Sequence, residues 1–155
     1  MQIDQRQCRA MTLDDVPAVA QIERTVQFHP WNSRQFVESL ESGQRCTVWV
    51  EAGQVVGFCI LQPVLDEANL LLMGIAPQMQ GRGLGFALLD QSIERLGDGC
   101  VMVFLEVRTS NAAALALYEK SGFHRMGVRK NYYPAAQGGK EDAVLMALTR
   151  GNPFA

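Results

Sequence analysis

Residues 80–85, QGRGLG, form a glycine-rich stretch just before a segment that we expect to be helical. Glycine destabilises a helix by roughly 1 kcal/mol relative to alanine, so a run of three needs an explanation. A strand-to-helix junction presents unpaired N–H groups and the positive end of the helix dipole, and glycine removes the Cβ atoms that would keep a phosphate away. The stretch therefore predicts a backbone cradle for a pyrophosphate, with an ordinary glycine-rich turn as the alternative.

A carboxylate and a phenol further along the chain could transfer protons. Glu106 ends the apolar segment VMVFLEVR, so its carboxylate emerges where the strand ends and could remove a proton from an amine. The alternative is an ion pair with Arg108, which lies two residues on and on the same face. Tyr118 follows Leu115 by three positions, and Asn111 lies near the start of the same predicted helix. From the residues alone, core packing and a helix cap are their ordinary interpretations.

Two adjacent tyrosines, Tyr132 and Tyr133, precede a proline in NYYP. Neighbouring side chains of a strand point to opposite faces, so we expect at most one of the two to line a given pocket. Sheet packing followed by a turn is the alternative. The basic stretch before them, RMGVRK, is interpreted as a solvated face and given no role in a site.

The composition excludes several classes of protein. The 155 residues suggest one domain. The net charge of −2 does not indicate a basic surface of the kind that binds nucleic acid. No apolar run approaches the roughly 18 residues of a membrane span, and the first residues lack the apolar core of a signal peptide, so we expect a cytoplasmic protein. With two histidines and no CxxC pair, a metal site is not expected. Small buried hydrophobic positions are predicted for the cysteines Cys8, Cys46, Cys59 and Cys100.

The hydrophobic periodicity predicts seven strands and four helices in the order β-α-α-β-β-β-α-β-α-β-β. Such interleaving favours a mixed sheet with helices on both faces, where ligands bind at the carboxyl ends of strands. Asn32 and Gln35 resemble a capping box. Strands 69–76 and 101–108 have few polar residues, so we expect both to be buried. The strands are predicted at 6–11, 45–52, 55–65, 69–76, 101–108, 123–134 and 141–150, and the helices at 12–26, 32–42, 86–97 and 109–122.

The ordered set of motifs resembles the GCN5-related N-acetyltransferase family. QGRGLG matches the family's acyl-CoA motif, Q/R-x-x-G-x-G/A, and LEVRTSNAAALALYEKSGF resembles the second half of its fold. FHPW and NYYP are similar to segments of the RimI-type branch, which acetylates protein N-termini. The resemblance covers about residues 6–149. It implies a single α/β domain over 1–149, with a mixed, mostly antiparallel sheet flanked by helices on both faces, and a short tail at 150–155.

The resemblance also implies roles for individual residues. Glu106 would be the general base and Tyr118 the acid that protonates the departing thiolate. Trp31, Tyr132 and Tyr133 would lie in the two loops that clamp the substrate. Gly81 departs from the family, whose members often have a larger polar residue there. The residues expected to bind acetyl-CoA are Met73, Gly74, Ile75, Gly81, Arg82, Gly83, Leu84, Gly85, Phe86 and Asn111.

The function implied is transfer of acetyl from acetyl-CoA to the N-terminal α-amine of a protein, without a metal. In the RimI-type branch the substrate is the N-terminal alanine of the eighteenth protein of the small ribosomal subunit. No contact with nucleic acid or membrane is expected. Two alternatives stay open: an acetyltransferase of the same fold that acts on a small amine, and a regulatory module that binds acyl-CoA without turnover.

Overall fold

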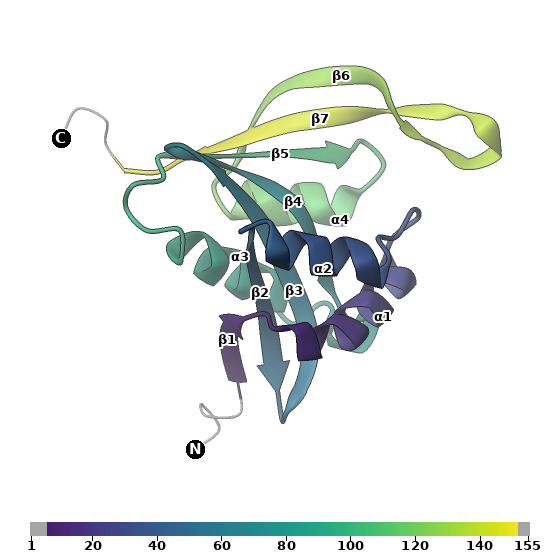
Figure 1. Cartoon of the computed structure of the whole chain (residues 1–155). Coiled ribbons are helices and arrows are strands. Elements are labelled where there is room, and N and C mark those ends of the chain that lie inside the picture. Colours follow the sequence, from purple (N-terminus) through teal and green to yellow (C-terminus); the bar gives the residue numbers. More distant parts are fainter. Residues whose placement is uncertain (1–5, 152–155) are drawn as a thin grey trace.

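The computed structural model describes residues 6–151. One seven-stranded sheet, in the order β1-β2-β3-β4-β5-β7-β6, forms the centre of the domain (Figure 1). β4 and β5 are parallel, and every other neighbouring pair is antiparallel. The strands are β1 (Arg6–Ala10), β2 (Arg45–Glu51), β3 (Gln54–Val64), β4 (Glu67–Ile75), β5 (Met102–Arg108), β6 (His124–Pro134) and β7 (Lys140–Thr149). The helices are α1 (Val16–Val26), α2 (Ser33–Glu41), α3 (Leu84–Glu94) and α4 (Ala112–Lys120).

The predicted order of strands and helices is confirmed, and short-range contacts explain several boundaries. At the start of α2, the Gln35 N–H donates to Asn32 Oδ1 and the Asn32 N–H donates to Gln35 Oε1, both at 2.9 Å, so the predicted capping box is present. α3 begins at Leu84, two residues before the predicted start at Phe86. Gly83 adopts a φ of +80° and acts as the N-cap, which turns the chain into the helix earlier.

Helices cover both faces of the sheet, as predicted, and two neighbouring residues of β3 show which helix lies on which face. A Cβ atom on Gly57 would lie 3.2 Å from Leu88 of α3. The ring of Phe58 packs on Phe36 of α2, with ring centroids 5.5 Å apart. Successive residues of a strand point to opposite faces, so α3 and α2 lie on opposite sides of the sheet. Figure 1 shows α1 and α2 together on the near side.

β4 and β5 separate soon after they pair. The ladder between them joins residues 67–69 to residues 102–104 and ends there. On its other side, β4 changes register against β3 between Leu70 and Leu72, so Leu71 forms a bulge. A bulge bends its strand and increases the local twist. Residues 70–75 of β4 and 105–108 of β5 consequently flank a gap in the sheet.

The prediction that β4 and β5 are fully buried is wrong. β4 and β5 were expected to be buried strands, but Leu71, Leu72 and Met73 are only half-buried, and β5 alternates between buried and half-buried positions. The sequences of β4 and β5 are as apolar as those of fully buried strands, so composition alone could not reveal this exposure. In β4 the exposure falls on residues 71–73, which have no hydrogen-bonded neighbour on the side of the gap. In β5 it falls on every second residue, including Met102 and Phe104, which pair with both β4 and β7, so it belongs to one face of that strand.

Cys46, Cys59 and Cys100 are buried and Cys8 is half-buried, and all four thiols are free. Burial raises the pKa of Cys46 to about 11, so this thiol is uncharged at neutral pH. Within residues 6–151, no helix is both long and apolar enough to cross a bilayer, and no group of three or more His, Cys, Asp or Glu side chains is placed to hold a metal ion.

A fully buried carboxyl group lies between α1 and the segment that leads to α2. Glu23 is 0% exposed, and the Trp31 N–H donates to its Oε2 at 3.0 Å. Its Oε1 has no hydrogen-bond partner in the described chain. Burial raises the pKa of Glu23 from its ordinary 4.5 to about 7, with the Trp31 N–H opposing the shift.

Glu23 should therefore make the stability of the fold depend on pH. The unfolded chain releases this proton near 4.5 and the folded chain near 7, so the stabilisation is complete below the first value and is lost as pH rises through the second. Compared with the Glu23→Gln variant, the wild-type protein should lose free energy of unfolding between about pH 5 and about pH 8. Urea denaturation of both proteins at the two pH values measures this difference. A difference that stays constant would contradict the prediction.

Candidate active site

The gap between β4 and β5 opens into a cleft of about 840 Å³. The start of α3, part of α4 and the segment that follows α1 complete its walls. Arg82 is exposed and does not line the cleft, and Tyr132 lines a second cavity of about 630 Å³ that meets the first at Glu106 and Tyr133. The other predicted site residues all line the cleft, namely Trp31, Met73, Gly74, Ile75, Gly81, Gly83, Leu84, Gly85, Phe86, Glu106, Asn111, Tyr118 and Tyr133.

The three glycines around the start of α3 serve two purposes. Gly81 and Gly83 have φ values of +77° and +80°, a region that glycine adopts readily and other residues rarely do. No atom lies within 4 Å of a Cβ built on either residue, so the turn, and not the available space, requires glycine there. At Gly85 a Cβ would lie 3.3 Å from Leu117, so the small residue lets α3 approach α4 closely.

The loop leaves a row of N–H groups free at the cleft. The first bond of α3 runs from the Ala87 N–H to the Gly83 carbonyl at 3.2 Å. Within residues 6–151, the N–H groups of residues 81–86 meet no acceptor. Together with the positive end of the helix dipole, these donors suit a pyrophosphate. Lys120, whose Nζ lies 5.0 Å from the ring centre of Phe86, adds a cation at the rim of the cleft.

The open side of β4 contributes further donors. The Ala76 N–H donates to the Val56 carbonyl of β3 at 2.8 Å. Backbone groups of alternate residues point to opposite sides of a strand, so the N–H groups of Met73 and Ile75 face the gap, whereas that of Gly74 faces β3. Gly74 also lines the cleft, and packing explains why this residue is a glycine. A Cβ there would lie 2.8 Å from the Phe58 ring, so glycine is needed for packing.

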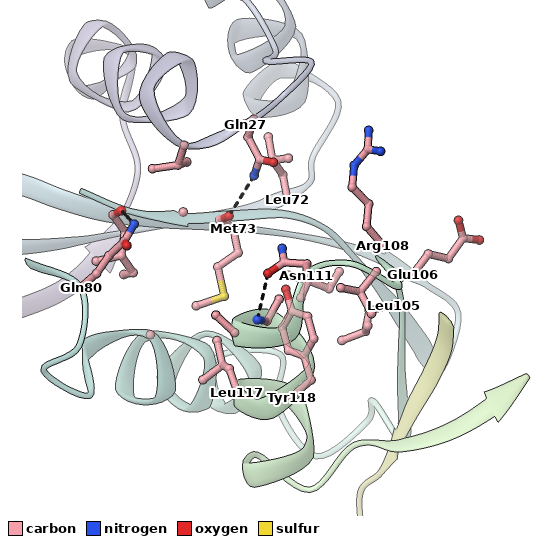
Figure 2. A pocket seen from close by; sticks show the side chains of 18 of the residues that line it. Gln27, Leu72, Met73, Gln80, Leu105, Glu106, Arg108, Asn111, Leu117 and Tyr118 are labelled. Atoms are coloured by element: carbon pink, nitrogen blue, oxygen red, sulfur yellow. Dashed lines mark hydrogen bonds between the residues drawn. The ribbon is translucent and has the colours of Figure 1, made fainter. Parts of the chain in front are cut away.

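Two glutamine side chains donate hydrogen bonds to the backbone carbonyl groups on that same side of β4. Gln27 Nε2 donates to the Met73 carbonyl at 3.4 Å, and Gln80 Nε2 donates to the Ile75 carbonyl at 3.0 Å. Figure 2 shows both bonds on the wall of the cleft. Because the acceptors of Met73 and Ile75 are already paired, this part of β4 offers a ligand mainly N–H donors.

α4 places Asn111 and Tyr118 on the same wall. The Ala114 N–H donates to Asn111 Oδ1 at 3.1 Å, which confirms the predicted helix cap. The Tyr118 ring packs on Phe123, with centroids 5.9 Å apart, as expected of a core position. Figure 2, however, shows its hydroxyl pointing toward Met73 and Asn111 in the cleft. Burial raises the pKa of Tyr118, so the phenol is protonated at neutral pH.

Glu106 does not pair with Arg108, so the alternative considered for this residue is wrong. Within residues 6–151, the ion-pair partner of Arg108 is Glu141, and that of Glu106 is Arg129, with 3.5 Å between Arg129 Nη1 and Glu106 Oε1. Both members of the second pair are partly exposed, so the attraction is weak. A hydrogen bond to Glu106 raises the pKa of Tyr132. The carboxylate is therefore accessible from the cleft and free of a buried ion pair.

The expectation for the two adjacent tyrosines is wrong as well, because both line the second cavity. The register between β6 and β7 shifts between Arg129 and Tyr133, and Asn131 has a φ of +53°. This irregularity interrupts the alternation of side chains and brings the rings of Tyr132 and Tyr133 within 4.9 Å of each other. Burial raises the pKa of Tyr133 to about 12.

Glu106 and Tyr118 lie on opposite faces of β5. Val103 pairs with Leu148 of β7, and a Cβ on Gly122, just after α4, would lie 3.1 Å from the Leu148 side chain. α4 and Tyr118 therefore cover the face of β5 to which Val103 points. Glu106 is an odd number of residues from Val103 and points to the other face. Figure 2 shows its carboxylate directed away from Tyr118.

This arrangement can transfer a group between two molecules that enter from opposite sides. A carboxylate on one face can accept a proton from an incoming nucleophile, and a phenol on the other can protonate a leaving group. The backbone donors of β4 line the same cleft, where they could stabilise an oxyanion.

Sequence reasoning missed four side chains of the site, namely Gln27, Arg108, Lys120 and Arg129. Arg108 was considered only as a partner for Glu106, although its position two residues on already places it at the same edge. Arg129 was assigned to a solvated face. No local signal connects it to Glu106, because their contact depends on the registers of three strands.

Comparison with known proteins agrees with this geometry. The family described as "Acetyltransferase (GNAT) family" matches residues 9–123. The "[Ribosomal protein bS18]-alanine N-acetyltransferase" of Salmonella typhimurium is 42% identical over 139 residues, which is 89% of this chain and 93% of the relative. The protein of that name from Escherichia coli K12 is 42% identical over 86% of this chain and 90% of its own length.

A solved structure extends the comparison to three dimensions. The crystal structure of the ribosomal-protein-S18-alanine N-acetyltransferase from Escherichia coli superposes with a TM-score of 0.87 at 37% identity, over 97% of this chain and 98% of the other. The chain therefore belongs to the acetyltransferase (GNAT) family and is an acetyl-CoA-dependent N-acetyltransferase.

Proposed function

We propose that the chain acetylates the N-terminal α-amine of a protein, and that its substrate is the N-terminal alanine of ribosomal protein bS18. The observation that carries the proposal is the placement of Glu106 and Tyr118 on opposite faces of one strand at one cleft. The name shared by relatives that are 42% identical over nine-tenths of their length supports the substrate. The proposal places the enzyme in the cytoplasm, where ribosomal proteins are made.

Acetyl-CoA would occupy the side of the cleft formed by α3 and α4. The free N–H groups of residues 81–86 would hold its pyrophosphate, with Lys120 close by. The N–H groups of Met73 and Ile75 would pair with the amide-rich pantetheine arm and polarise the thioester carbonyl. The Asn111 Nδ2 group, which the helix cap leaves free, would donate to the same arm.

The protein N-terminus would enter from the Glu106 side, between the segment that contains Trp31 and the β6–β7 hairpin. An α-amine has a pKa near 8, so at neutral pH most of it carries an extra proton and cannot attack. Glu106 takes this proton, directly or through a water molecule. The nitrogen lone pair then attacks the thioester carbon and the C–N bond forms. The nitrogen releases its second proton to solvent, and Glu106 also returns its proton to solvent before the next cycle.

The C–S bond breaks as the intermediate collapses, and its electron pair leaves with sulfur. Tyr118 supplies the proton that this thiolate needs and regains one from solvent, so each cycle releases one net proton. A thiol has a pKa near 8.5 and phenol about 10, so donation depends on direct contact between the hydroxyl and the sulfur. Burial raises the pKa of Tyr118 as well as that of a thiolate formed beside it, so burial alone does not favour the transfer.

The direct test uses purified enzyme, acetyl-CoA and ribosomal protein bS18 with a free N-terminal alanine. Mass spectrometry should detect one acetyl group on the α-amine, and bS18 with a blocked N-terminus should stay unmodified. Acetylation of polyamines or aminoglycosides but not of bS18 would instead indicate an enzyme for small amines. Binding of acetyl-CoA without release of CoA for any amine would indicate a regulatory module.

Replacing Glu106 with glutamine keeps the shape of the side chain and removes the proton acceptor. Turnover should fall by about 10²- to 10⁴-fold while the affinity for acetyl-CoA changes little. The defect should shrink as pH rises above the amine's pKa of about 8, because the substrate then arrives deprotonated. Steady-state kinetics over this pH range measure the effect. Glu119→Gln, at an exposed glutamate outside both cavities, is the matched control. An equal loss at every pH would contradict the assignment.

The Tyr118→Phe variant removes the hydroxyl and keeps the ring, so it distinguishes proton donation from packing. If the hydroxyl is the general acid, turnover should fall by about 10²-fold while the melting temperature stays near that of the wild type, because the contact with Phe123 is kept. CoA release and thermal unfolding are measured on the same preparation. Full turnover in a folded variant would rule out this role and leave the enzyme class unaffected.

A further inference from the structure

Arg108 connects the two segments that flank the Glu106 side of the cleft. Its Nη1 donates to the Pro134 carbonyl at 2.7 Å and to Glu141 Oε1 at 3.0 Å, at the base of the loop between β6 and β7. The guanidinium carbon lies 4.6 Å from the ring centre of Tyr133 and 5.5 Å from that of Phe28, which follows α1. One side chain thus contacts both segments.

We propose that Arg108 is a positioning residue that sets the distance between these two segments and thereby adapts the enzyme to polypeptide substrates. The inference rests on the proposed function, because a polypeptide that leaves the cleft must pass between them. A small amine ends before it reaches them. Displacing the Arg108 side chain should therefore weaken the binding of a long peptide more than that of a small amine.

The chemistry of the side chain suits this role. A guanidinium is planar and always charged, so it can donate in its plane while its faces lie against aromatic rings. Arg108 uses both properties, and its side chain is only 22% exposed, so solvent weakens these contacts less than at the surface. A lysine ammonium at this position could keep the charge but could not make the in-plane and stacking contacts together.

Glu141 holds Arg108 without lining the cleft itself. Its Oε2 accepts from the Ser110 N–H at 3.1 Å and from Thr109 Oγ1 at 3.3 Å, while its Oε1 accepts from Arg108. The carboxylate therefore connects β7 to the turn between β5 and α4. This position allows an experiment to separate positioning by Arg108 from direct contact with the substrate.

The test compares Arg108→Lys and Glu141→Gln with the wild-type enzyme on two substrates, alaninamide and a hexapeptide with the bS18 N-terminal sequence. Both variants should raise the KM for the hexapeptide by about tenfold and change that for alaninamide by less than about threefold. Affinity for acetyl-CoA, measured by calorimetry, should stay at the wild-type value. Arg125→Lys, in an exposed ion pair with Glu119 that lines neither cavity, is the matched control.

The KM values of the variants decide whether Arg108 acts as a positioning residue. Equal increases in KM for the two substrates, or no increase for the hexapeptide, would overturn the inference. An effect of Arg108→Lys without one of Glu141→Gln would also overturn it, because Arg108 would then act by touching the substrate. Failure of the wild-type enzyme to acetylate the hexapeptide would instead contradict the proposed function, independently of both variants.

Discussion

The early end of the ladder between β4 and β5 is the constraint on which the site depends. Because the two strands pair only over residues 67–69 and 102–104, the backbone donors of Met73 and Ile75 have no neighbouring strand to satisfy them. The same gap gives access to both faces of the sheet at one point. Had the ladder continued, Glu106 and Tyr118 would have been separated by a closed sheet.

Two irregularities in the strands shape this opening. The bulge at Leu71 bends β4 away from β5, and the irregularity around Asn131 directs both tyrosines of β6 toward one cavity. In each case a local break in the ladder changes where side chains point. The regular strands supply rigidity, and the two breaks supply the geometry of the cleft.

Features that depend on near neighbours were predictable from the sequence. The capping box at Asn32, the cap at Asn111 and the order of the elements follow from patterns within a few residues. Contacts between distant segments were not predictable in this way. Arg108 meets Glu141, 33 positions away, and the gap in the sheet leaves no mark on the apolar pattern of β4. Most of the cleft residues came from the resemblance to a family, not from the physical pattern.

The pairing within the β6–β7 hairpin separates the loop at its tip from the residues that transfer protons. Register resumes beyond the irregularity, with Tyr133 opposite Glu141 and Pro134 opposite Lys140. Insertions between these last two residues would lengthen the loop and leave the pairing of Arg108 with Ala143 on β5 and β7 unaltered. The chain thus carries its proton-transfer groups on β5 and α4, apart from the β6–β7 loop. A change in the length of this loop would alter the space beside the cleft while Glu106 and Tyr118 keep their places on β5 and α4.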